Sequence, residues 1–139
     1  MRSPVSASSS SVAATLPAVV LVVDDDRQIR ELALRALERQ GYAVLAAASG
    51  QEALDRLADP RTRVDVMLVD MSMPGLTGVQ TLAAAKERRP GLPVALMSGY
   101  SADQLWPGPR PDYDAFLDKP FDLRELAACV EGMLPPSRS

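Results

Sequence analysis

Four apolar segments of the sequence are each followed closely by a side chain that can bind a cation or an anion. Carboxylates are the ligands that hard divalent cations prefer, and hydroxyl and ammonium groups donate hydrogen bonds to anionic oxygens. Three aspartates follow the first segment, and an aspartate, a serine and a lysine follow the others. In chain order these residues are Asp24, Asp25 and Asp26, then Asp70, Ser98 and Lys119.

Carboxylates that share one cleft repel one another, and each raises the pKa of its neighbours. A magnesium ion relieves this repulsion, because it takes two or three carboxylates and a backbone carbonyl as ligands and keeps several waters. We therefore expect Asp24, Asp25 and Asp70 to form a magnesium site. Beside it, the Lys119 ammonium and the Ser98 hydroxyl would complete a pocket for a phosphoryl group.

The elements that must bring these residues together alternate between strand and helix. Between the strands, apolar residues recur at helical spacing, and Ser/Thr/Asp-x-x-Glu/Gln patterns mark helix starts at residues 49–52, 77–80 and 122–125. This alternation requires right-handed crossovers and a parallel sheet that is covered on both faces. Short apolar stretches predict five strands, over residues 19–23, 42–47, 64–69, 92–97 and 115–117.

We expect a doubly wound α/β fold, a flavodoxin-like three-layer sandwich with the strand order 2-1-3-4-5. In such sheets, ligands bind at the carboxyl ends of the strands. Strands one and three are neighbours in this order, so their terminal aspartates should converge. Asp26 should instead cap the helix that follows.

The fourth helix is expected to be short. Pro107, Pro109 and Pro111 stand within five residues of one another, and proline cannot continue a helix. We predict one or two helical turns from residue 101, followed by a rigid loop.

Composition excludes several classes of function. The 139 residues are enough for one domain. With 15 basic and 18 acidic side chains, the net charge of −3 lacks the electrostatic footprint of a general nucleic-acid binder, so we expect no direct contact with nucleic acid. The absence of histidine excludes Ser-His-Asp catalysis and histidine-ligated zinc. Cys129 is the only cysteine, which excludes an internal disulfide.

The two ends of the sequence differ from its middle. Residues 1–17 are rich in Ser, Ala and Pro, and we expect a disordered tail or linker there. The apolar run over residues 12–23 is interrupted by Pro17 and followed by three aspartates, which argues against a signal peptide and against membrane insertion. We expect one domain over residues 18–135, a short tail over 136–139, and a cytoplasmic protein.

The sequence resembles the receiver domain of two-component response regulators. The similarity extends over about residues 19–135 and keeps the order and spacing of the family's motifs. These motifs read LVVDDD over residues 21–26, LVDMSMPGLTG over 68–78, MSG over 97–99 and LDKPF over 117–121.

The resemblance implies that Asp70 is a phosphoacceptor. It would attack a phosphohistidine on a histidine kinase or a histidine phosphotransfer protein, and the phosphorylated domain would regulate a downstream protein effector. The implied cofactor is Mg²⁺, held by Asp24, Asp25, Asp70 and the backbone carbonyl of Ser72. Such a domain catalyses only its own phosphorylation and dephosphorylation, so it is not an enzyme in the usual sense.

The resemblance also implies a conformational switch. Ser98 and Lys119 would bind the phosphoryl oxygens, and a cis Lys119-Pro120 bond would direct the lysine inward. Phe116 occupies the switch position, where its ring would turn inward when Ser98 moves. Gly75 and Gly78 would serve the loop after Asp70.

Two alternatives and one subfamily stay open. The sequence over residues 97–101 and the short fourth helix are similar to receivers at the end of hybrid sensor kinases. A phosphohydrolase of the haloacid-dehalogenase type would use Asp24 as nucleophile within Asp24-x-Asp26, although Arg27 departs from that pattern. The second alternative is a receiver that serves only for docking, and the complete set of site residues argues against it.

Overall fold

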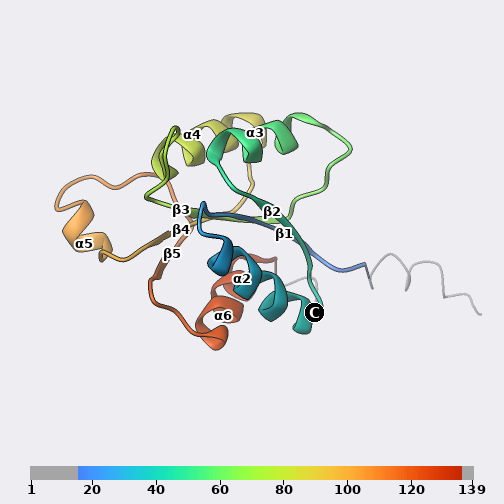
Figure 1. Ribbon diagram of the computed structural model, residues 1–139. Coiled ribbons are helices and arrows are strands. Elements are labelled where there is room, and N and C mark those ends of the chain that lie inside the picture. Colours follow the sequence, from blue (N-terminus) through green and yellow to red (C-terminus); the bar gives the residue numbers. More distant parts are fainter. Residues whose placement is uncertain (1–15, 136–139) are drawn as a thin grey trace, which may run out of the picture.

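A five-stranded parallel sheet forms the middle layer of the computed structural model, which describes residues 16–135 (Figure 1). The strand order β2-β1-β3-β4-β5 confirms the doubly wound, flavodoxin-like fold. The predicted tails fall largely outside the described residues: only Leu16 and Pro17 of the first are included, and none of the second. The strands are β1 (Val19–Val23), β2 (Ala43–Ala47), β3 (Val66–Asp70), β4 (Val94–Ser98) and β5 (Ala115–Asp118).

Helices cover both faces of the sheet. Helices α2 (Arg27–Arg39) and α6 (Leu123–Met133) pack on one face, and α3 (Gly50–Ala58) and α4 (Gly78–Arg88) pack on the other (Figure 1). Alternate residues of β1 point to opposite faces, so Val20 and Val22 join the core with α2 and α6 while Leu21 and Val23 join the core with α3 and α4. Burial on both faces explains why this strand is apolar without interruption.

Side-chain caps fix where the helices begin. The Asp26 carboxylate accepts a hydrogen bond from the backbone N–H of Gln28, which confirms the predicted cap of α2. Reciprocal capping boxes begin α4 at Thr77 and α6 at Asp122. At α3 the box is modified, because Glu52 accepts from the N–H of Ala48 while Ser49 accepts from Glu52.

Strands β3 and β4 begin two residues later than the apolar pattern predicts and end one residue later. The Asp65 carboxylate accepts a hydrogen bond of 2.7 Å from the N–H of Val19, so a side chain replaces a backbone acceptor at the start of β3. Pro93, just before β4, has no N–H to donate. The later ends place Asp70 and Ser98 within the strands, where the backbone holds them.

The short fourth helix is confirmed as α5 (Ala102–Leu105), which has four residues. It ends at Leu105, and Trp106 caps it before the proline-rich loop. No helix within residues 16–135 has the length and apolarity that crossing a membrane requires.

Candidate functional site

Three aspartates meet at the carboxyl edge of the sheet, where β1 and β3 lie side by side. Asp24 and Asp25 follow β1, Asp70 ends β3, and one carboxylate oxygen from each lies within 4.8 Å of the others. Asp24 is fully buried and Asp70 almost so, whereas Asp25 is exposed. An all-oxygen donor set of this kind fits a hard cation such as Mg²⁺.

Lys119 joins two of these aspartates. Its Nζ atom donates to Asp24 Oδ2 at 2.8 Å and to Asp70 Oδ1 at 3.0 Å. The lysine directly follows strand β5, and the Lys119-Pro120 bond is cis, as predicted. The ammonium therefore compensates two buried carboxylates that would otherwise repel each other.

Burial and neighbouring charges shift the pKa values of Asp70 and Lys119. Burial raises the pKa of the Asp70 carboxyl, and the Asp24 charge raises it further, while the hydrogen bond from Lys119 opposes both effects. Burial alone would lower the pKa of Lys119, but its hydrogen bonds to Asp24 and Asp70 outweigh burial and raise it. Lys119 is thus a permanent cation at neutral pH.

Ser98 lies buried at the end of β4, on the far side of β3 from β1. Its Oγ atom accepts a hydrogen bond of 3.0 Å from the N–H of Tyr100, and its carbonyl accepts one of 2.7 Å from the N–H of Lys119. The second bond couples the backbone beside the serine to the backbone of the lysine. Among the described residues, the hydroxyl proton of Ser98 has no acceptor, so it can be donated to an anion.

Ser72 is exposed in the loop after β3. Its backbone N–H hydrogen-bonds the Asp70 carboxylate, which partly offsets the rise in the pKa of Asp70. The use of its carbonyl as a metal ligand stays a prediction.

Gly78, the first residue of α4, lets the helix approach the end of β3. A Cβ atom at this position would lie 2.5 Å from the Asp70 carbonyl oxygen and 2.7 Å from the Met71 Cα atom. Its N–H donates to the carbonyl of Met71 at 3.2 Å. Gly75 serves the same loop differently, with a φ of +79° that side-chain-bearing residues rarely adopt.

We predict that Gly78→Ala lowers the free energy of unfolding by about 1–3 kcal/mol, because backbone atoms rather than flexible side chains must move. Gly132→Ala is the matched control: it lies in α6 with no atom within 4 Å of an added Cβ, and we expect a gain of about 0.5 kcal/mol. Urea denaturation of both variants measures the difference. Equal stability of Gly78→Ala and the wild type would contradict the close approach.

Phe116 belongs to an aromatic cluster that sequence reasoning recognised only in part. Its ring lies 5.9 Å from Trp106 in a T-shaped arrangement and 5.7 Å from Tyr113. Tyr113 packs against both rings, and its hydroxyl accepts a hydrogen bond from Arg110. Trp106 was missed because it follows α5 in sequence and reaches β5 only in the fold.

Arg30, on the first turns of α2, is a second residue that the sequence did not single out. Its Nη1 atom donates to the Asp24 carbonyl at 2.7 Å. A signal existed, because Arg30 shares a helical face with Ala33 and Leu37, which are buried. A charged residue on a buried face needs a polar partner.

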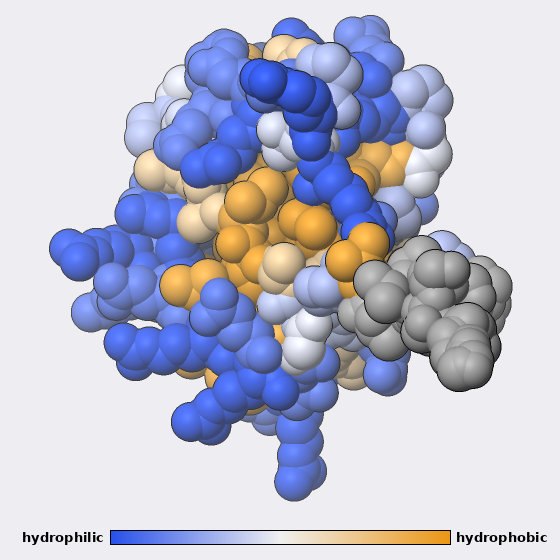
Figure 2. Space-filling model, turned by 90° about the vertical axis from the view of Figure 1, so that its right-hand side faces the viewer, coloured by the Kyte–Doolittle hydropathy of each residue, from blue (hydrophilic) through white to orange (hydrophobic). Residues whose placement is uncertain are grey.

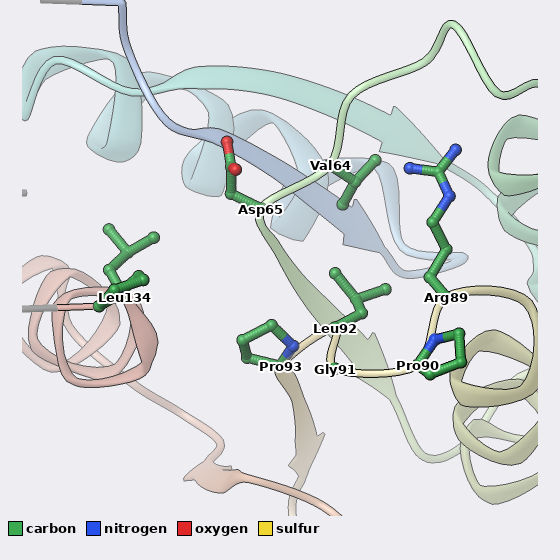
Figure 3. A pocket seen from close by; sticks show the side chains of 9 residues that line it. Val64, Asp65, Arg89, Pro90, Gly91, Leu92, Pro93 and Leu134 are labelled. Carbon is green, nitrogen blue, oxygen red and sulfur yellow. The ribbon is translucent and has the colours of Figure 1, made fainter. Parts of the chain in front are cut away.

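A cavity of about 350 Å³ lies at the opposite edge of the sheet, where the strands begin. Apolar residues gather at the centre of this face and hydrophilic ones surround them (Figure 2). Leu134 lines one side of the cavity and Val64 and Leu92 the other (Figure 3). The two charged residues among its lining already have hydrogen-bond partners: Arg89 donates to the carbonyls of Leu57 and Asp59, and Asp65 accepts from the N–H of Val19.

Comparison with known proteins decides the family. The model of the response regulator receiver domain matches residues 20–131 of the chain. The chain belongs to this family. Receiver domains are signalling switches of two-component systems rather than classical enzymes, and the family binds Mg²⁺ at an acidic pocket. They interact with histidine kinases and downstream effectors.

Relatives of this receiver domain occur in two kinds of protein. The sensor kinase CckA of Brucella abortus is 36% identical over 118 residues, which cover 84% of this chain and 12% of the kinase. The response regulator MprA of Mycolicibacterium vanbaalenii is 36% identical over 120 residues, which cover 86% of this chain and 51% of MprA. The chain therefore spans about half of MprA and a small part of the kinase, and the equal sequence identity favours neither kind.

A solved structure supports the same family. The response regulator TrrA of Thermotoga maritima, in complex with Mg(2+)-BeF, is 29% identical and has a TM-score of 0.72. The match covers 84% of this chain and 99% of the TrrA chain.

Proposed function

We propose that this receiver domain is a phosphorylatable switch in a two-component phosphorelay. Asp70 accepts a phosphoryl group from a phosphohistidine of a histidine kinase or a histidine phosphotransfer protein, and the domain then regulates a downstream protein effector. The observation that carries the proposal is the Lys119 ammonium between the buried carboxylates of Asp24 and Asp70. A permanent cation beside a buried carboxylate can hold the oxygens of an incoming phosphoryl group.

The chemistry of the proposed transfer follows from this arrangement. An Asp70 carboxylate oxygen forms the new P–O bond while the P–N bond of the phosphohistidine breaks and its electron pair returns to the imidazole. Lys119 and Ser98 donate hydrogen bonds to the transferred phosphoryl oxygens. Asp24, Asp25, Asp70 and the Ser72 carbonyl would hold Mg²⁺, whose charge neutralises that of the phosphoryl group.

The haloacid-dehalogenase alternative requires Asp24 as nucleophile, and its surroundings disfavour that role. Asp24 is fully buried, and both of its carboxylate oxygens already accept hydrogen bonds: Oδ1 from the N–H of Asp26 and Oδ2 from Lys119. The Asp70 carboxylate accepts from Lys119 with Oδ1 and from the Ser72 N–H, but it is less completely buried than Asp24 and lies beside the exposed Asp25. We therefore favour Asp70 as the nucleophile.

Two small donors test the proposed function. Phosphoramidate carries the P–N bond of a phosphohistidine, and p-nitrophenyl phosphate is a phosphate ester. We expect phosphoramidate with Mg²⁺ to add one phosphoryl group to the protein, as measured by intact mass, and we expect no sustained release of nitrophenol from the ester. Catalytic ester turnover without a phosphoprotein would favour the hydrolase instead.

The switch that we propose leads from Ser98 to Phe116. Phosphorylation adds about −1.5 to −2 charges and three acceptor oxygens at Asp70, which draw the Ser98 hydroxyl inward. The Phe116 ring then turns into the space behind Ser98. Because Trp106 packs edge-on against Phe116, this movement also disturbs α5, which buries none of its own residues.

We predict that beryllofluoride with Mg²⁺ changes amide hydrogen exchange at residues 98–106 and 113–118, in addition to the loops that hold Asp24 and Asp70. The prolines of the following loop should confine the change to these segments. Trp106 fluorescence is a second readout, since its indole contacts Phe116. Changes at residues 24–26 and 70–78 alone would contradict this route.

The remaining proposals concern context. We propose that residues 18–135 form the receiver domain and that it acts in the cytoplasm without direct contact to nucleic acid. The short α5 is the feature that the sequence shares with receivers of hybrid sensor kinases, and it changes the surface beside β5. We therefore favour the hybrid-kinase type of receiver. Co-purification with a histidine kinase would test this assignment.

A further inference from the structure

The peptide that links Asp24 to Asp25 is held by an arginine outside the acidic cluster. Arg30 is half-buried on α2, and its Nη1 atom donates a hydrogen bond of 2.7 Å to the carbonyl oxygen of Asp24. Within residues 16–135, Arg30 forms no ion pair with any carboxylate. Its guanidinium thus binds a backbone carbonyl, although three carboxylates lie close together at the same edge of the sheet.

All other polar groups of Asp24 are also fixed. Its N–H donates to the carbonyl of Ala47 at 3.1 Å, and its carboxylate accepts from the N–H of Asp26 at 2.9 Å and from Lys119 at 2.8 Å. With the bond from Arg30, both the side chain and the backbone of Asp24 have a defined orientation.

The position of the Asp25 carboxylate depends on the fixed backbone of Asp24. Its carboxylate is exposed and has no hydrogen-bond partner in the part of the chain that the structure describes. The position of Asp25 therefore follows from its backbone, and the Asp24 carbonyl belongs to the peptide that sets its φ angle. Arg30 fixes the plane of that peptide.

We infer that Arg30 is a positioning residue that holds Asp25 ready to bind a divalent cation. The inference rests on the proposed magnesium site. Arg30 affects the affinity for Mg²⁺ in two opposite ways. Its positive charge repels a nearby cation and weakens binding, whereas its hydrogen bond orients a ligand and strengthens binding. Removing the side chain reveals which effect is larger.

The test measures the dissociation constant of Mg²⁺ by amide chemical shifts in the wild type, Arg30→Met and Arg30→Lys. We expect Arg30→Met to bind roughly tenfold more weakly, as is typical when a group that orients a metal ligand is lost. Arg30→Lys keeps the charge and one donor without the planar fork, so we expect an intermediate affinity. Arg35→Met is the matched control: it removes one exposed charge from the same helix and should leave the affinity unchanged.

Backbone relaxation of the Asp25 amide in chelator separates positioning from general stability. We expect increased mobility of this amide in Arg30→Met and not in Arg35→Met. Affinity of Arg30→Met equal to or tighter than that of the wild type would overturn the inference. If Arg30→Met does not fold, Arg30→Lys decides: weaker binding supports the inference, and wild-type affinity overturns it. Failure of the wild type itself to bind Mg²⁺ would overturn the magnesium site and this inference together.

Discussion

Asp70→Asn is expected to abolish phosphoryl incorporation from acetyl phosphate and Mg²⁺. An amide lacks the anionic oxygen that attacks phosphorus, and no other described carboxylate combines the near-complete burial of Asp70 with contacts to both Lys119 and the Ser72 N–H. Intact mass spectrometry measures the gain of one phosphoryl group in the wild type and its absence in the variant.

Asp118→Asn is the matched control, because Asp118 is an exposed carboxylate at the same edge of the sheet, at the end of β5. The Asp118→Asn variant should gain one phosphoryl group, as the wild type does. Incorporation by Asp70→Asn at the rate of the wild type would refute the assignment of the phosphoacceptor.

Lys119→Met is expected to lower the free energy of unfolding by about 3 kcal/mol at pH 7 in chelator, since it leaves two buried carboxylates without their cation. Mg²⁺ should restore most of the lost stability, because a cation at the aspartates replaces the missing charge. The variant should bind Mg²⁺ with an affinity equal to or higher than that of the wild type. Urea denaturation with and without Mg²⁺ measures both effects.

Lys86→Met is the control for this experiment. Lys86 has the same 22% side-chain exposure as Lys119 and pairs with Asp114 at 2.6 Å, but the Asp114 side chain is 40% exposed. We expect a loss below about 1 kcal/mol and no effect of Mg²⁺. A loss in Lys119→Met no larger than in Lys86→Met would contradict the compensating role of Lys119.

Acidification should reduce the deficit of Lys119→Met. Burial already raises the pKa of Asp70, and the loss of Lys119 removes the hydrogen bond that lowers it. A carboxyl whose pKa is higher in the folded state binds its proton more tightly there than in the unfolded state. The free energy of unfolding therefore rises as the pH falls from that raised pKa toward the ordinary value of an aspartate.

Lys119→Met should also separate phosphorylation from the switch. Without the ammonium, the phosphoryl oxygens lose one of the two donors that connect Asp70 to strands β4 and β5. We expect no change in amide exchange at residues 113–118 after treatment with beryllofluoride and Mg²⁺. Changes of the wild-type size in this segment would remove Lys119 from the signalling route.

The sheet and its reactive edge could be predicted because their causes are local. Burial on both faces makes Val20–Val23 continuously apolar, and the carboxyl ends of parallel strands share one edge. The order of the strands follows from right-handed crossovers. The start of β3 could not be predicted, since the shift at Asp65 depends on a hydrogen bond to Val19, 46 residues away.

Contacts that form only in the folded chain account for what the sequence did not reveal. Trp106 follows a helix of four residues, and only the fold brings it to Phe116 on β5. The place of Arg30 on a buried helical face indicates that it needs a polar partner, but the sequence does not identify that partner as the Asp24 carbonyl. Composition and spacing indicate which side chains can react, whereas the residues that orient them are found from the packing.

The most direct test of the central claim is to map the phosphoryl group on the wild-type protein. Borohydride reduces an aspartyl phosphate to homoserine, which peptide mass spectrometry locates along the chain. After treatment with phosphoramidate and Mg²⁺, we predict homoserine at position 70 alone, and none when a chelator is present. Homoserine at position 24 would indicate the dehalogenase-type nucleophile, and homoserine at no position would contradict the phosphorylatable switch.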